Sequence, residues 1–302
     1  DKSYRFNFDH IAVNSLRKDF TIRSFNIVPF ASEMSFANHF HFQKDRYEVS
    51  LSGISLQGID MNSLLDKRLE ASQLVINKVN AKIYRDLHKP LEEKSKVGNY
   101  PSQMLLKLSR QINIPKATIN NADIEYRENE PVSNKTGEID FMNSNLTITN
   151  ITNIPAVIQN RSRLNIAFQS KILGSIPITG NFDFSLKGNN GDFLANGQIP
   201  AFDALQLNKV SIPMALIKIS SGKINGIDFH FTGDNNSAKG DFVMKYQDLK
   251  VDVLKRDKKT NDIKKRGLAT LAANLLVANE NPTSEGLRKE DPEFKRDINK
   301  SF

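Results

Sequence analysis

Two neighbouring stretches of alternating residues lie at 161–187, RSRLNIAFQSKILGSIPITGNFDFSLK. Apolar side chains such as Leu164 and Phe168 in the first stretch, and Phe182 and Phe184 in the second, alternate with polar or small residues. A period of two places such side chains on one face of an extended strand. The short gap between the stretches favours an antiparallel hairpin, because parallel pairing needs a crossover of about a dozen residues or more.

The alternation continues in both directions from this pair. Towards the N-terminus it occurs at Tyr4, Phe6 and Phe8, and between 74 and 84 it slips by one residue before Val79. Phe, which is abundant here, and Val, Ile and Thr favour strands. Between 114 and 254 the pattern predicts strands at 116–127, 137–150, 161–171, 176–187, 191–199, 207–219, 222–232, 238–247 and 249–254.

Other segments break the alternation. The stretch 87–100 is rich in Lys and Glu, which predicts a loop, and 101–112 has apolar residues at helical spacing behind Pro101, which predicts a short helix. After a polar loop at 255–262, an apolar stripe predicts a second helix, formed by Leu268, Leu271, Ala272, Leu275 and Leu276. We therefore expect a first β segment at 1–95, a helical connector at 96–115, a second β segment at 116–254, and a basic loop with a helical tail at 255–302.

Composition restricts the function classes. The chain has 302 residues and no cysteine, which excludes disulfides, thiolate metal sites and cysteine nucleophiles. Its net charge of +8 suits an anionic partner, but no arginine-rich groove with interleaved aromatic residues indicates nucleic acid. The sequence shows no transmembrane helix and no signal peptide, and both ends look cut, so we expect a fragment whose targeting segment lies elsewhere.

Candidate catalytic and metal-binding patterns are weak. His39 and His41 would share one face of a strand, but we interpret them as polar residues that alternate with Phe40 and Phe42. Carboxylate pairs such as Asp183 with Asp192 are typical of the solvent-exposed face of a sheet. No serine elbow, phosphate loop or dinucleotide fingerprint occurs. The sequence therefore predicts a protein that is not an enzyme and has no metal and no cofactor.

One basic cluster supports two interpretations. It consists of Lys255, Arg256, Lys258, Lys259, Lys264, Lys265 and Arg266. It is either a solvated loop with a first helical turn or a contact with anionic lipid headgroups at a membrane surface. In the second case, the following amphipathic helix would lie against the bilayer.

Several segments resemble the AsmA-like family of bacterial envelope proteins, most closely its Bacteroidetes-type members. They are Ala81–Asp86 with the following charged loop and short helix, KATINNADIEYRE from Lys116, GEIDFMNSNLTI from Gly137, and 221–253. The resemblance covers about 45–300. It implies a periplasmic β-groove, related to bridge-like lipid transfer proteins, with an inner-membrane anchor that this chain lacks. It also implies a role in outer-membrane homeostasis, with phospholipids as partners and no catalytic residues.

The sequence thus predicts an elongated, curled antiparallel β-sheet, a β-groove, with a short connecting helix and a helical C-terminal tail. Its apolar face would bind or conduct acyl chains through Ile139, Phe141, Leu146, Ile148, Leu164, Ile166, Phe168, Ile178, Phe182, Phe184, Phe229, Phe231, Phe242 and Met244. Two alternatives stay open. One is a non-catalytic scaffold with a closed β core that docks other envelope proteins through strand edges. The other is a glycan-binding or glycan-cleaving β protein, against which the absence of Trp counts.

Overall fold

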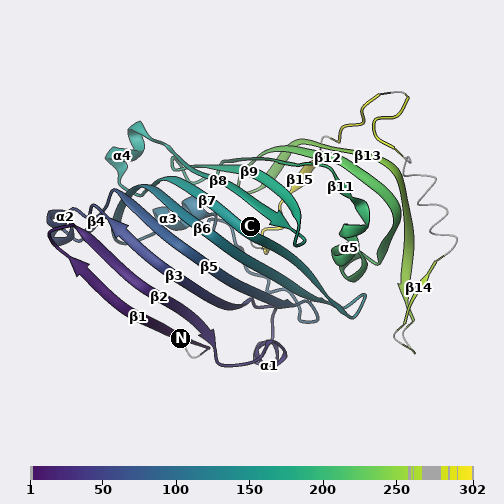
Figure 1. The fold of residues 1–302 in the computed structure, drawn as a ribbon, viewed down its shortest axis with the longest axis horizontal. Helices are drawn as coiled ribbons and strands as arrows, with labels where there is room; N and C mark the ends of the chain where they lie inside the picture. The colour runs from purple at the N-terminus through teal and green to yellow at the C-terminus, as the bar shows by residue number, and fades with distance from the viewer. Residues whose placement is uncertain are drawn as a thin grey trace.

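The computed structural model describes residues 3–257, 260, 262–266, 280–284, 286–290 and 292–300. In these residues, fifteen strands form one sheet that curls along its length and does not close on itself (Figure 1). The predicted mainly β, curled architecture is confirmed.

Twelve strands follow one another across the sheet, and three short strands lie off this path. The path is β1 (Tyr4–Asn14), β2 (Asp19–Pro29), β3 (Arg46–Gln57), β5 (Gln73–Asp86), β6 (Gln111–Glu130), β7 (Lys135–Thr152), β8 (Arg163–Ile172), β9 (Ile176–Ser185), β10 (Phe193–Ile199), β12 (Ile217–Gly233), β13 (Ser237–Arg256) and β14 (Ile263–Lys265). The short strands are β4 (Arg68–Glu70), β11 (Phe202–Asp203) and β15 (Glu293–Lys295), which pair with β6, β12 and β13.

The sheet is mixed, whereas an antiparallel sheet was expected. β5 and β6 are parallel neighbours, and β4 also runs parallel to β6. The connection from Asp86 to Gln111 is long enough for the crossover that a parallel pair requires. Because β5 pairs directly with β6, the two predicted β segments belong to one continuous sheet.

The helices agree only in part with the predictions. α3 (Pro101–Leu106) begins at the predicted residue, with Pro101 in its first turn. The predicted strand at 207–219 is wrong: the 3₁₀ turn η1 (Ala204–Leu207) and α5 (Asn208–Ala215) occupy most of it. Leu216 then adopts a left-handed backbone conformation that ends α5, and β12 follows. The strands expected at 238–247 and 249–254 form the single strand β13.

Three more short helices lie in connections: α1 (Glu33–Asn38), α2 (Met61–Leu65) and α4 (Pro155–Asn160). His39 is the C-terminal cap of α1, so the expected strand through His39 and His41 is wrong. The helix predicted from Leu268 to Ala278 lies outside the described residues. In the described part of 280–300 the chain runs beside β13, where β15 forms, instead of adopting a helix.

Apolar residues occupy one face of the sheet from β1 to β13. Residues directly opposite each other in a ladder point to the same side of a sheet. The register joins Val13, Phe20, Leu56 and Leu74 across β1, β2, β3 and β5, and the same parity continues into β6. We call this side the apolar face and the opposite side the polar face.

A line of irregular pairing crosses β1, β2, β3, β5 and β6 at one level. There the apolar residues are three apart instead of two, and on each strand the ladder leaves one or both of the residues between them unpaired. The spaced pairs are Phe8 and Ile11, Ile22 and Phe25, Leu51 and Ile54, Ile76 and Val79, and Ile119 and Ala122. His10, Gly53 and Asn121 take a left-handed backbone conformation on this line. Because the slips coincide, no strand turns its apolar residues outward.

Candidate apolar binding face

All fourteen predicted lining residues lie on the apolar face. On β8 and β9, Leu164 is opposite Phe184 and Ile166 is opposite Phe182. On β12 and β13, Phe229 is opposite Phe242. The ladders of β7, β9 and β10 join these pairs to Ile139, Phe141, Leu146, Ile148, Phe168, Ile178, Phe231 and Met244.

Most of these residues keep some solvent-accessible surface. Only Leu164, Ile178 and Phe184 are buried, and the other eleven are half-buried. A closed β core would bury the whole set, and a flat exposed sheet would expose it. The burial therefore describes a curled surface that two short helices cover at its ends.

The helix α3 packs on one end of the apolar face. Tyr100, the residue before it, is buried together with Leu164, Phe184 and Phe193. The Tyr100 hydroxyl donates a 2.8 Å hydrogen bond to the backbone oxygen of Asp234, at the β12–β13 turn. The connection from β5 to β6 thus crosses the apolar face, and its Tyr100 is hydrogen-bonded to the turn between β12 and β13 (Figure 1).

The other end is covered by α5 and η1. A buried cluster there joins Ile176, Phe202, Ala204 and Ile224, with Ile139 and Met244 packed against it. Between the two covered ends, Leu146, Phe168 and Phe229 lie on the apolar face and belong to neither buried cluster. The middle of the face on β7–β12 is therefore its least covered part.

The prediction omitted the extension of the apolar face onto β1–β3. Here Phe6, Phe8, Ile11 and Val13 of β1 are about half exposed or more, at 48%, 56%, 56% and 65%. The Phe8 ring stacks on Phe25 at 4.7 Å between centroids. The alternation at Tyr4, Phe6 and Phe8 was the available signal for this part of the face.

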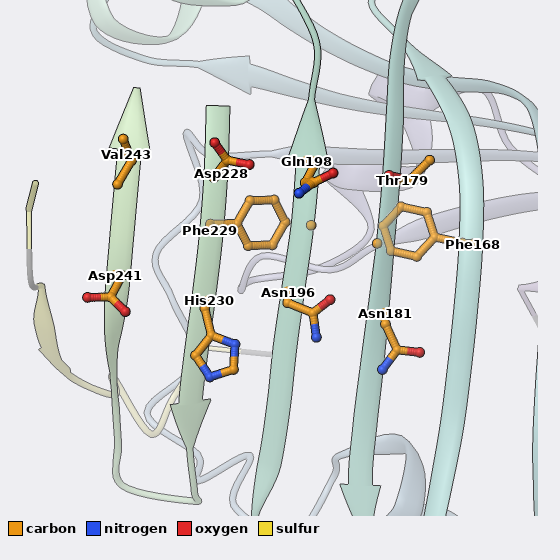
Figure 2. Close-up of a pocket in the computed structure, with 12 residues that line it drawn as sticks. Phe168, Thr179, Asn181, Asn196, Gln198, Asp228, Phe229, His230, Asp241 and Val243 are labelled. Carbon is orange, nitrogen blue, oxygen red and sulfur yellow. The ribbon is translucent and has the colours of Figure 1, made fainter. Parts of the chain in front are cut away.

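Two phenylalanine rings lie over glycines of neighbouring strands in the centre of the sheet. A Cβ built on Gly180 would lie 2.6 Å from the Phe168 ring, and one on Gly197 would lie 2.5 Å from Phe229 Cζ. Figure 2 shows the Phe229 ring directed towards the strand of Gln198 and Asn196, and the Phe168 ring directed towards the strand of Thr179 and Asn181. Glycine at these sites leaves room for each ring to pack against the neighbouring strand. The apolar face is therefore covered by aromatic rings here.

The polar face carries a shallow depression of about 400 Å³ above the same glycines. Two rows of side chains flank it in Figure 2. One row contains Asp241, His230, Asn196 and Asn181, and the other contains Val243, Asp228, Gln198 and Thr179. Among the described residues, no group of three His, Asp or Glu side chains could hold a metal ion.

A second, polar pocket of about 300 Å³ lies where β3 and β5 meet the loop after β5. Arg85 donates two hydrogen bonds to Asp45, of 2.6 and 2.7 Å, and the Tyr47 hydroxyl donates one of 3.1 Å to the same carboxylate. Partial burial first, and then the charge of Asp45, raise the pKa of Tyr47 to about 12. The Asp45 hydrogen bonds raise the pKa of Arg85, so its positive charge is retained at every accessible pH.

The basic cluster forms a hairpin instead of a loop and helical turn. Lys255 of β13 pairs with Lys264 of β14, while Lys258 and Lys259 lie outside the described residues. Lys264 is 3.2 Å from Asp257, and Lys265 is 2.6 Å from Asp252. These ion pairs offset part of the positive charge. Arg256, Lys265 and Arg266 belong to the same hairpin, and a membrane contact there stays a prediction.

The sequence matches no protein-family model, and comparison with curated proteins finds no significant match. Among the described residues, no helix is long and apolar enough to cross a bilayer.

Proposed function

We propose that this chain binds lipid acyl chains along its apolar face, as the β-groove segment of an AsmA-like envelope protein. One observation carries the proposal: the register gathers apolar side chains from every strand of β1–β13 on one side of an open sheet. Its expected location is the periplasm, with an inner-membrane anchor outside this chain.

The face suits acyl chains because it offers area without polar specificity. Each methylene moved from water onto such a surface contributes roughly 0.8 kcal/mol. Ten methylenes would contribute about 8 kcal/mol before the entropy of association and of ordering the chain is subtracted. The half-buried Phe168 and Phe229 provide accessible apolar surface between α3 and α5.

A charge in the middle of the face tests the proposal. Leu146→Arg places a cation on the apolar face of β7, opposite Phe168. Thr149→Arg, three residues along the same strand and opposite Asn165, places the same charge on the polar face. The purified proteins are incubated with a photoactivatable fatty acid, and the crosslinked lipid is measured by mass spectrometry.

We expect Leu146→Arg to reduce crosslinking at least about tenfold, because an arginine on an apolar surface must be desolvated or displace the acyl chain. Thr149→Arg should leave crosslinking unchanged. Thermal unfolding of both variants verifies that they fold. Equal crosslinking in the two folded variants, or no lipid bound to the native chain, would contradict acyl-chain binding on this face.

A scaffold role has one observation in its favour. Among the described residues, the eleven-residue strand β1 pairs with β2 on one side and with no strand on the other. Such an edge is a template for another strand. Crosslinking in cells that yields protein adducts at β1 and no lipid adducts at Phe168 would favour the scaffold over the lipid groove.

A further inference from the structure

The polar pocket beside β3 and β5 lies at the end of the apolar face. Tyr47 lines the pocket and is opposite Ile83 in the ladder, on the same side of the sheet as Val49 and Leu51. Asp45 lies two residues before Tyr47, and Arg85 lies two residues after Ile83, so the alternation places both on the same side of the sheet as Tyr47. The pocket is therefore a polar rim on the apolar side, and we call it the rim pocket.

Positive charge exceeds negative charge in the rim pocket. Four cationic side chains line it, those of Lys44, Arg85, Lys96 and Lys300, against two carboxylates, those of Asp45 and Glu92. The bidentate contact with Asp45 neutralises Arg85. Lys96 Nζ lies 3.6 Å from a Glu92 oxygen, and this pair offsets the charge of Lys96 only weakly because both groups are partly solvated.

The remaining excess charge comes from Lys44 and Lys300. Lys44 Nζ lies 4.9 Å from the centre of the Phe40 ring, which positions it beside the pocket. Lys300 has a carboxylate of Asp297 at 3.9 Å, with both side chains well exposed, so this pair is weak. An excess of about two charges complements one phosphate group.

The apolar face continues from the rim pocket along β3 and β5. Val49, Leu51 and Ile54 of β3 are half-buried on this face. From Tyr47 to the half-buried Ile54 the strand spans about 23 Å, at roughly 3.3 Å per residue; beyond it, Leu56 is buried in a cluster with Ile59. That length exceeds the roughly 15 Å which the chains of one bilayer leaflet occupy. A single acyl chain thus fits between the rim pocket and Ile54 of β3.

We propose that the rim pocket binds the phosphate of an anionic amphiphile whose acyl chain lies along the apolar face of β3 and β5. This rests on the proposed function, because the acyl chain uses the same face. The rim pocket adds two properties that the apolar face lacks. It fixes the position of the lipid headgroup, and it makes the chain prefer phosphate-bearing lipids over neutral ones.

Two lipids with the same acyl chain test the proposal. They are palmitoyl lysophosphatidic acid and monopalmitoylglycerol, each radiolabelled and kept below its critical micelle concentration. Binding to the whole chain is measured by equilibrium gel filtration, with inorganic phosphate as a competitor. The variant is Lys44→Gln with Lys300→Gln. The control is Lys78→Gln with Lys82→Gln, which removes two exposed lysines of β5 from the polar face.

We expect the native chain and the control to bind the phosphate-bearing lipid about tenfold or more tightly than the neutral one. The Lys44→Gln, Lys300→Gln variant should lose that preference and keep its affinity for monopalmitoylglycerol. Equal affinities for both lipids in the native chain, or a preference that survives in this variant, would refute the rim pocket and leave the acyl-binding face intact.

Two further results separate the rim pocket from the proposed function. If neither lipid binds, both proposals fail together. If inorganic phosphate displaces lysophosphatidic acid while monopalmitoylglycerol does not bind, the pocket holds a free phosphate, and the amphiphile and the acyl-binding face are both refuted.

Discussion

Gly197→Ala tests whether the Phe229 ring packs over Gly197 on the apolar face. Gly197 is buried on β10, opposite Phe229 of β12. A Cβ at this position would lie 2.5 Å from Phe229 Cζ and 2.8 Å from the backbone oxygen of Thr179. Distances this short require the ring to tilt away and β9 to shift, so the substitution overpacks the sheet.

The expected cost combines two opposing effects. Overpacking a well-packed site destabilises a protein by about 1–3 kcal/mol. Replacing glycine by alanine in a strand recovers roughly 0.5–1 kcal/mol, because the unfolded chain loses conformational freedom. We therefore expect the free energy of unfolding to fall by about 1–2 kcal/mol for Gly197→Ala.

A second substitution identifies the ring as the cause. Phe229→Leu removes the atoms nearest to the new methyl group at a modest cost of its own, since similar apolar volume is retained. In that background, Gly197→Ala should cost less than in the native chain. The two substitutions should thus show a coupling energy of about 1 kcal/mol, within the range for residues in contact.

Equilibrium urea unfolding measures all four proteins. The denaturant slope must stay constant for the midpoints to report stability. An unchanged or increased stability of Gly197→Ala, or the same cost in both backgrounds, would falsify the placement of the Phe229 ring over Gly197.

Three further predictions concern the elements around the face. Tyr100→Phe should lower the free energy of unfolding by about 1 kcal/mol, because the buried ring loses its hydrogen bond to Asp234; an unchanged urea midpoint contradicts this. Since the folded pKa of Tyr47 exceeds its unfolded value of 10, its contribution to stability is present below pH 10 and is lost as the pH rises towards about 12. Asp45→Asn should lower that pKa in an ultraviolet titration of the tyrosines, and an unshifted titration argues against the contact. Arg296→Ala removes two hydrogen bonds to backbone oxygens and a stacking contact with Tyr100, so limited proteolysis should cut within 280–300 faster. A cleavage rate equal to that of the native chain contradicts this.

The candidate face was largely predictable because alternation within one strand is a local property. The apolar parity of Leu164, Phe168 and Phe182 could be read from neighbouring residues alone, and the ladders keep it. The segment 207–219 shows the limit: its apolar residues resemble a strand pattern, but they pack as a helix over Ile139 and Ile224. That choice depends on distant residues.

The rim pocket could not be predicted from the sequence. Lys44, Arg85 and Lys300 lie far apart in the chain and meet only because the loop after β5 and the C-terminal segment both cross to this edge. The backbone nitrogen of Lys96, for example, donates to the oxygen of Ile298. No pattern of spacing in the sequence reports such a meeting of remote segments.

By itself, the sequence determined that the chain forms strands with one apolar and one polar side, since a period of two is independent of what a strand pairs with. Only the tertiary structure decided that β5 and β6 pair in parallel, that α3 and α5 cover the two ends of the face, and that the sheet stays open. It also aligned the irregular spacing before Val79 with the same irregular spacing on four other strands. The physical reason is register: a one-residue error would turn a whole strand over, and only long-range pairing of the strands selects the alignment that keeps every apolar side chain on one face.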